Sequence, residues 1–160
     1  MSQPKVLASI FGRPKLRKTS DALACFPTAL CIGAPSAIRL VAENELGFTP
    51  RIHPNPPQTL PDVLQMLSNL ADSGRVNEYG AIILDDASHL CARSMLMWKE
   101  KAPSGKSGRK DHFWAYQQLA QALMHLSGMT RHIGAHMVMT WHERAGGMNA
   151  EGKYGPGGPS

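Results

Sequence analysis

The residues most able to do chemistry lie near the N-terminus, in the stretch FGRPKLRKTS at positions 11–20. It has the spacing of a phosphate-binding loop, G-x-x-x-x-G-K-[ST], with Gly12, Lys18 and Thr19 in three of the four fixed positions. In such a loop, backbone N–H groups and a helix N-terminus converge on phosphate oxygens, the lysine reaches the terminal phosphates, and the hydroxyl holds Mg²⁺. The spacing predicts a nucleotide site whose phosphate loop comprises Gly12, Arg13, Pro14, Lys15, Leu16, Arg17, Lys18, Thr19 and Ser20.

The fourth fixed position departs from the pattern, because Arg17 stands where the last glycine belongs. Glycine is favoured there since the backbone approaches the ligand closely, in a conformation that can cost a residue with a Cβ about 1–3 kcal/mol. The Arg17 guanidinium either offsets part of that cost near the phosphates or leaves affinity and hydrolysis reduced. A basic surface turn is the alternative interpretation of the whole stretch.

Two acids follow the apolar run AIIL, and they are the expected second half of the site. A carboxylate at the end of a buried strand can hold the Mg²⁺ water shell opposite the Thr19 hydroxyl, so Asp85 is the expected partner of Thr19 at the metal. Asp86 then contacts the groups that bind the metal, or it orients the attacking water. Its alternative role is to cap the helix that follows.

A third polar cluster ends the run HMVMTWHE at positions 136–143. Here Thr140 and His142 are expected to sense the terminal phosphate or to position water, whereas a solvated turn is the alternative for His142. Glu143 is expected to be an exposed acid, with a role as a base as the alternative. Gly146 stands where H-E-x-x-H requires its second histidine, so we expect no metal site made from protein ligands alone.

These residues need a scaffold that brings three strand ends together. Apolar runs predict strands at 6–11, 29–32, 81–84 and 135–140, and a brief strand is also expected at 51–53. The strands alternate with segments of helical character at 18–24, 36–44, 59–73, 88–98 and 111–128. This alternation predicts an α/β domain with a mainly parallel sheet, whose sites lie at the carboxyl ends of the strands. We expect the strand ending at Thr140 to neighbour the other two.

Local signals set several boundaries. Ser36, Thr59 with Asp62, and Asp111 are expected to cap helices, and the polar segment 99–110 is expected to be a mobile loop. Apolar residues of the last helix, among them Phe113, Trp114 and Tyr116, are expected to pack in the core, with base stacking as the alternative for Trp114 and Tyr116.

Composition gives broader limits. The chain has 160 residues, 42% of them hydrophobic, and a formal charge of +5, which suits one globular domain and favours polyanionic partners such as nucleic acid. It has neither a run of about 20 apolar residues nor a cleavable leader pattern, so we expect a cytoplasmic protein without membrane association. Cys25, Cys31 and Cys91 are expected to be reduced and mostly buried.

Taken together, these motifs make the chain resemble the RecA-like P-loop ATPases encoded by bacteriophages, a group linked to single-strand annealing and recombination. The resemblance rests on three segments. FGRPKLRKT corresponds to Walker A, AIILDD to Walker B, and HMVMTWHE to the later strand that carries the polar residue found after Walker B in this family. It implies a three-layer P-loop core at 1–145, a flexible Gly/Pro-rich tail at 146–160, ATP and Mg²⁺ as cofactors, and a place in the host cytoplasm. Such cores usually continue with further strands, so either the core is truncated or the tail begins a loop whose continuation is absent.

The resemblance also implies a function, in which ATP hydrolysis is coupled to single-stranded DNA during phage recombination or replication. Lys18 would neutralise phosphate charge, and Asp86 or His142 would place the attacking water. The cations of the basic segment would contact DNA, unless they belong to a merely solvated loop: Lys101, Lys106, Arg109 and Lys110. A ring or filament of identical subunits is the usual assembly. Family members often carry a catalytic acid just after the second strand, but CIGAPS has none. The main alternative is therefore a degenerate, non-hydrolysing nucleotide-binding scaffold or DNA-binding module, and a small kinase is a third possibility.

Overall fold

A five-stranded sheet, with every strand parallel to its neighbours, is the centre of the computed structural model, which describes residues 5–13, 16–104 and 110–142. The strands lie in the order β1-β5-β4-β2-β3. Their bounds are β1 Leu7–Gly12, β2 Leu30–Gly33, β3 Arg51–Ile52, β4 Ala81–Asp85 and β5 His136–His142. The α/β class and the parallel sheet predicted from the sequence are therefore confirmed.

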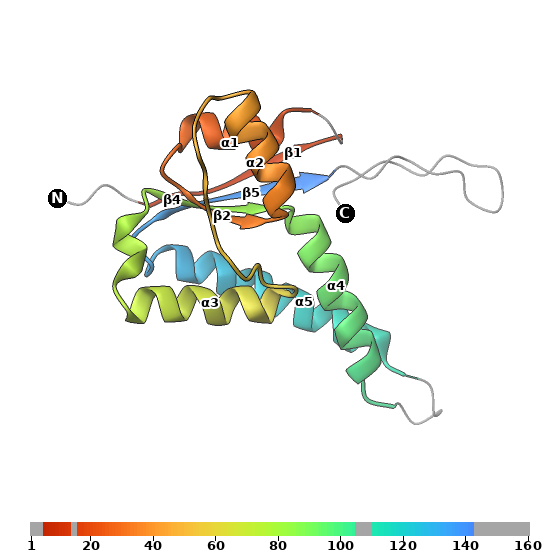
Figure 1. The fold of residues 1–160 in the computed structure, drawn as a ribbon. Coiled ribbons are helices and arrows are strands. Elements are labelled where there is room, and N and C mark those ends of the chain that lie inside the picture. Colours follow the sequence, from red (N-terminus) through yellow and green to blue (C-terminus); the bar gives the residue numbers. More distant parts are fainter. Residues whose placement is uncertain (1–4, 14–15, 105–109, 143–160) are drawn as a thin grey trace, which may run out of the picture.

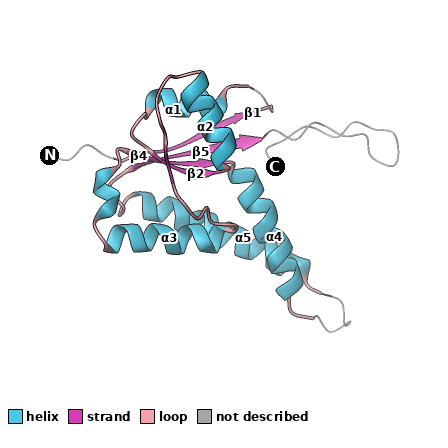
Figure 2. Ribbon diagram, viewed as in Figure 1, coloured by secondary structure: helices cyan, strands magenta, loops and turns pink. Residues whose placement is uncertain are grey.

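Helices cover both faces of this sheet, which gives three layers (Figure 1). Two helices lie on one face and the longer helices lie on the other (Figure 2). The bounds are α1 Lys18–Cys25 and α2 Pro35–Asn44 on the first face, and α3 Leu60–Asp72, α4 Ala87–Lys101 and α5 His112–Thr130 on the second. A short 3-10 turn, Arg75–Glu78, connects α3 to β4.

Alternating strand residues divide the core into two parts, one on each face of the sheet. Cys31, Ile83 and Val138 pack with α1 and α2, whereas the strand residues next to them, such as Ile32 and Leu84, pack with α3, α4 and α5. Parallel strands buried on both faces are uninterrupted apolar runs, and this is why the runs in the sequence identified them.

Two of the three predicted caps are present. Thr59 accepts a hydrogen bond from the backbone N–H of Asp62, whose side chain accepts from the backbone N–H of Thr59, and the Asp111 carboxylate accepts from the start of α5. The prediction for Ser36 was wrong, because α2 begins one residue earlier, at Pro35. Proline is well suited to the first helical position, where its missing N–H would have no partner anyway.

The loop expected at 99–110 begins later, because its first three residues belong to α4. Helix α4 continues through Lys99 to Lys101, where cationic side chains interact favourably with the negative end of the helix dipole. Beyond it, Ser104 and Lys110 form an isolated antiparallel bridge. The predicted tail, 146–160, lies outside the described residues. Among the helices that the structure describes, none combines the length and the apolar character needed to cross a bilayer.

Candidate functional site

Three strand ends meet at one edge of the sheet. Strand β5 lies between β1 and β4, as expected, with His142 in register with Gly12. Asp85 ends β4 and is in register with Gly33 at the end of β2. The polar residues that follow these strands are therefore brought together, although they lie far apart in the chain.

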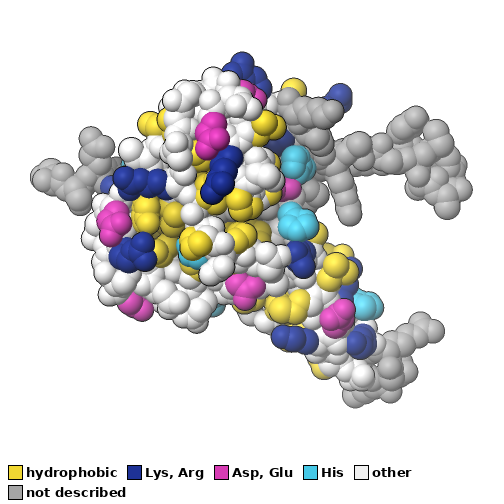
Figure 3. All heavy atoms as spheres, viewed as in Figure 1, with side chains coloured by type: hydrophobic (Ala, Val, Ile, Leu, Met, Phe, Trp, Pro, Cys, Tyr) yellow, Lys and Arg dark blue, Asp and Glu magenta, His cyan; other side chains and the backbone are white. Residues whose placement is uncertain are grey.

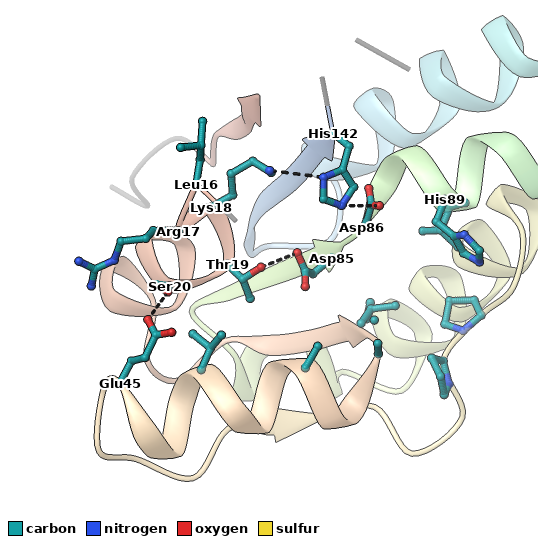
Figure 4. Close-up of a pocket in the computed structure, with 18 of the residues that line it drawn as sticks. Leu16, Arg17, Lys18, Thr19, Ser20, Glu45, Asp85, Asp86, His89 and His142 are labelled. Atoms are coloured by element: carbon teal, nitrogen blue, oxygen red, sulfur yellow. Dashed lines mark hydrogen bonds and ion pairs between the residues drawn. The ribbon is translucent and has the colours of Figure 1, made fainter. Parts of the chain in front are cut away.

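Lys18 is buried at the first turn of α1, with 7% of its surface exposed. Its Nζ donates hydrogen bonds to the carbonyl oxygens of Gly12, at 3.0 Å, and Arg13, at 2.7 Å. The same Nζ lies 3.5 Å from Nδ1 of His142 (Figure 4). The ammonium is thus held at the inner side of the loop, beside the other polar residues of the site.

Asp85 gathers two hydroxyl groups on one carboxylate oxygen. Thr19 Oγ1 donates to Asp85 Oδ1 at 2.8 Å, and Thr140 Oγ1 donates to the same oxygen from β5. Thr140 is almost fully buried, so its hydroxyl holds the carboxylate in place. Sequence reasoning missed this contact, because nothing in the spacing of residues 85 and 140 shows that they meet.

The Thr19 and Asp85 pair fits Mg²⁺, which prefers hard oxygen ligands and is usually held by one or two carboxylates together with phosphates and water. Within residues 5–13, 16–104 and 110–142, no three His, Cys, Asp or Glu side chains converge as a metal centre would require. The oxygens of Thr19 and Asp85 would therefore need phosphate and water to complete a coordination sphere.

Asp86 caps α4, which was the alternative role considered for it, and it also contacts His142. Its Oδ1 accepts from the backbone N–H of Ser88 at 2.8 Å and caps α4, while its Oδ2 lies 3.0 Å from Nε2 of His142. The His142 backbone N–H donates to Ser88 Oγ at 2.9 Å, which ties the end of β5 to the start of α4. The peptide bond between Asp85 and Asp86 is cis.

These contacts fix the tautomer of a neutral His142. Lys18 can only donate, so Nδ1 accepts from the ammonium and Nε2 carries the proton that Asp86 accepts. An ammonium, an imidazole and a carboxylate thus form a continuous chain of contacts across the site. The solvated-turn interpretation of His142 does not describe this arrangement.

Arg17 adopts the left-handed backbone conformation, with φ 50° and ψ 17°, at the position before α1. This is the conformational demand predicted for the missing glycine. The guanidinium points away from Lys18 and Asp85 (Figure 4). The backbone of the loop thus keeps a glycine-like shape although the residue is not glycine.

The structure describes only some of the remaining residues of the predicted phosphate loop. Leu16 is exposed at the rim, and Ser20 is buried and donates to Glu45 Oε2 at 2.7 Å. Pro14 and Lys15 lie outside the described residues. Sequence reasoning did not assign Glu45 a role, and its contact with Ser20 brings it to the site.

Gly33 was also missed, although the site depends on it. A Cβ added to Gly33 would lie 1.6 Å from the backbone oxygen of Asp85. The end of β2 therefore approaches the acid-bearing end of β4 more closely than any other residue type allows.

A cavity of about 640 Å³ opens beside these residues. It is lined by the start of α1, the end of β2, one face of α2, the segment 56–58, the start of α4, and His142. Lys18, Thr19, Asp85, Asp86 and His142 therefore share one cavity, of a size typical for small-molecule sites.

Two thiols close to the site are kept protonated. Burial, with a further contribution from the Asp85 charge, raises the pKa of Cys31 to about 12. Burial, with a contribution from Asp86, raises the pKa of Cys91 to about 11. Cys25 is exposed, so the prediction of mostly buried thiols holds for two of the three.

The candidate DNA-contacting cations are only partly described. Lys101 and Lys110 are exposed near the far end of the α4–α5 pair, and the Lys110 ammonium donates to the Glu100 carbonyl oxygen. Lys106 and Arg109 lie outside the described residues. Figure 3 shows cationic and hydrophobic side chains together on this part of the surface.

The aromatic residues of α5 divide between core and surface. Trp114 packs against the core, as predicted, but the prediction for Phe113 and Tyr116 was wrong, since they are 68% and 56% exposed. Lys99 Nζ lies 5.8 Å from the centre of the Tyr116 ring, within cation–π range. The start of α5 extends past the sheet together with α4, so this part of the helix has no sheet to pack on (Figure 1).

Comparison with models of known protein families gives no match, and comparison with curated proteins gives none either. A functional assignment therefore depends on the geometry described above.

Proposed function

We propose that this chain is a RecA-like P-loop NTPase of the kind that bacteriophages encode, which binds ATP with Mg²⁺ and acts with single-stranded DNA in phage recombination or replication. One observation carries the proposal. The Lys18 ammonium, the Thr19 hydroxyl and the Asp85 carboxylate, from two distant segments of the chain, line one cavity at the carboxyl edge of a parallel sheet. Ligands of open α/β sheets bind at this edge.

Each residue has a role that follows from its chemistry. Lys18 would exchange its contacts with loop carbonyls for phosphate oxygens and so neutralise their charge. Thr19 and Asp85 would hold the cation, and Mg²⁺, when bound, reduces the negative charge on the phosphates. Helix α1 adds the N–H groups of its first turn, which favour anions.

His142 and Asp86 are the candidates for orienting water. The Asp86 carboxylate holds Nε2 of the imidazole and directs Nδ1 toward Lys18. When the ammonium turns to a phosphate, Nδ1 can accept a proton from water instead, which is the geometry expected of a general base and its orienting partner. Attack of that water on the terminal phosphorus would release ADP and phosphate.

The surface at the far end of α4 and α5 supports a nucleic-acid partner. Lys99, Lys101 and Lys110 supply positive charge there, and exposed Phe113 and Tyr116 supply rings. Cations neutralise phosphates without reading sequence, and aromatic rings stack on unpaired bases. Assembly into a ring or filament, in which a neighbouring subunit completes the site, belongs to the same proposal.

A non-hydrolysing nucleotide-binding scaffold or DNA-binding module is the alternative, and two observations favour it. Arg17 holds a left-handed conformation that is costly for its residue type, and the end of β2 offers Gly33 and Ala34 to the cavity where a catalytic acid would be useful. In this alternative the protein binds ATP and DNA but turnover stays at background.

Replacement of Lys18 by alanine tests both versions. Lys18→Ala is expected to abolish ATP binding measured by calorimetry, while Lys5→Ala, a matched change at an exposed lysine outside the site, leaves it intact. ATP turnover with and without single-stranded DNA then separates enzyme from scaffold. Normal ATP binding by Lys18→Ala would contradict the proposed site, and tight binding by the wild type without turnover would select the scaffold.

A further inference from the structure

Part of the cavity has a chemistry that phosphate binding does not explain. Beyond Thr19 and Asp85 the cavity continues between the end of β2, one face of α2 and the proline-containing segment that precedes α3 (Figure 4). We call this part the apolar compartment, and its walls are Ile32, Ala34, Ala37, Val41, Pro56 and Pro57.

The charges around the apolar compartment disfavour further phosphate. The lysine and arginine that line the cavity within the described residues, Lys18 and Arg17, both belong to the phosphate loop and the start of α1. The acids Asp85 and Glu45 line it too. Nearby carboxylates repel a further anion, so an uncharged group suits these walls better than a phosphate.

Hydrogen-bonding groups are found at the margins of the apolar compartment. At the α1 side, Ser20 donates to Glu45 Oε2 at 2.7 Å, and both residues line the cavity. A carboxylate accepts several hydrogen bonds, so Glu45 can accept an N–H in addition to the Ser20 hydroxyl. Gln58 also lines the cavity; its amide already donates to the Pro56 carbonyl oxygen and accepts from Arg93, and the amide nitrogen has a second N–H.

We propose that the apolar compartment binds a nucleobase, with its flat faces against α2 and the prolines and an amino group donating to Glu45. A nucleobase combines an uncharged ring with N–H groups at its edge, which matches aliphatic walls next to a carboxylate. The inference depends on the proposed function, because the phosphate half of the cavity is assigned there. The base belongs either to the bound triphosphate or to a separate nucleoside.

Filling the apolar compartment with a large side chain tests the proposal. Ala37 is exposed on α2, so Ala37→Trp can be accommodated without disturbing the core, and Ala120→Trp, at an exposed position on α5 across the sheet, is the matched control. ATP, inorganic tripolyphosphate and adenosine, each with Mg²⁺, are titrated by calorimetry. Ala34→Trp serves as a second filling variant if the urea midpoint of Ala37→Trp falls below that of the control.

The outcomes distinguish the two sources of the base. If Ala37→Trp lowers the affinity for ATP by about tenfold or more and leaves the affinity for tripolyphosphate unchanged, the base is that of the triphosphate. If adenosine binds wild-type protein saturated with a non-hydrolysable ATP analogue and Ala37→Trp removes that binding, the base belongs to a separate nucleoside. The inference is overturned if the filled variants bind ATP and adenosine as the wild type does.

Failure of the proposed function gives a different result. A wild-type protein that binds neither ATP nor tripolyphosphate would overturn the phosphate site. Adenosine binding that Ala37→Trp removes would still support the apolar compartment in that case.

Glu45 has its own test, because inosine triphosphate lacks the amino group of ATP. Wild-type protein is expected to prefer ATP over inosine triphosphate by about tenfold, the value of one hydrogen bond to a charged acceptor. Glu45→Ala should remove the preference, whereas Glu43→Ala, at an exposed neighbouring acid that does not line the cavity, should keep it. Equal affinity of the wild type for both triphosphates would overturn the role of Glu45.

Discussion

At the scale of single residues, Arg17 shows how a loop can keep its shape without the usual residue. Its φ of 50° is one that glycine adopts readily and that costs other residues about 1–2 kcal/mol. The strain is local, since the Arg17 carbonyl still accepts from the backbone N–H of Asp21 at 2.8 Å and so begins α1 normally.

Arg17→Gly is therefore expected to be more stable than Arg17→Ala by about 1 kcal/mol. Both variants remove the guanidinium, and only glycine removes the Cβ that makes the conformation costly. The free energy of unfolding from urea titration measures the difference. Equal stability of the two variants would show that the left-handed conformation carries no cost here.

Gly33 gives the opposite case, a position where a methyl group has no room. Gly33→Ala is expected to lower the free energy of unfolding by about 1–3 kcal/mol, because a Cβ would lie 1.6 Å from the Asp85 carbonyl oxygen and must push β2 and β4 apart. The control is Gly80→Ala, whose Cβ would meet Thr28 Oγ1 at an ordinary 3.6 Å. Similar urea midpoints for the two variants would contradict the close approach.

At the scale of elements, the start of α4 connects stability to the site through Asp86. The carboxylate caps the helix through Ser88 and holds His142 at the same time. Asparagine caps helices about as well as aspartate but lacks the charge, so the two roles can be separated.

Asp86→Asn is expected to keep the helix cap, whereas Asp86→Ala should be less stable than Asp86→Asn by about 1 kcal/mol. Both variants should lower ATP turnover if the charge orients His142. Urea unfolding measures the first difference and steady-state kinetics the second. Full turnover by Asp86→Asn would remove the charge of Asp86 from the mechanism.

The sequence predicts the elements better than it predicts their surroundings. Strands β1, β2, β4 and β5 were located because each is an apolar run, whereas the brief β3, with its exposed Arg51, has no such signal. Thr59 and Asp111 were located because capping depends on residues close in the chain. Phe113 and Tyr116 were assigned to the core because helical spacing shows which residues share a face, but not how far the helix extends beyond the sheet.

The same distinction applies to the site. Lys18, Thr19, Asp85, Asp86 and His142 were expected at one edge of the sheet because phosphate and Mg²⁺ demand particular residue types at strand ends, and all five line one cavity. The contacts of Thr140 with Asp85 and of Glu45 with Ser20 join segments far apart in the chain, and their geometry depends on the strand order and helix packing. A single sequence contains no local signal for either contact.

At the scale of the whole molecule, the two buried thiols make stability depend on alkaline pH. The pKa of Cys31 is about 12 and that of Cys91 about 11 in the folded protein, against 9.0 for an unperturbed thiol. Between pH 9 and the folded values, the unfolded chain loses these protons while the folded protein keeps them. Their contribution to stability therefore falls as pH rises through this window.

Thiol labelling is the direct test. At pH 8, a disulfide reagent is expected to label Cys25 in the folded protein and to label Cys31 and Cys91 only after unfolding, because the thiolate is the reactive form. Cys25→Ser should leave the folded protein almost without fast labelling. Rapid reaction of Cys31 or Cys91 in folded Cys25→Ser at pH 8 would contradict the burial described here.

The position of β5 between β1 and β4 has a consequence for synthesis on the ribosome. The two flanking strands emerge first, and the sheet has a gap at its centre until His136–His142 has left the exit tunnel. Because β1 pairs with no other strand in the described structure, a nascent chain that stops before β5 has no partner for β1 and cannot bring the lysine and the carboxylates into one cavity. A ligand of this cavity therefore cannot assist the early stages of folding, and it can act only after β5 has emerged.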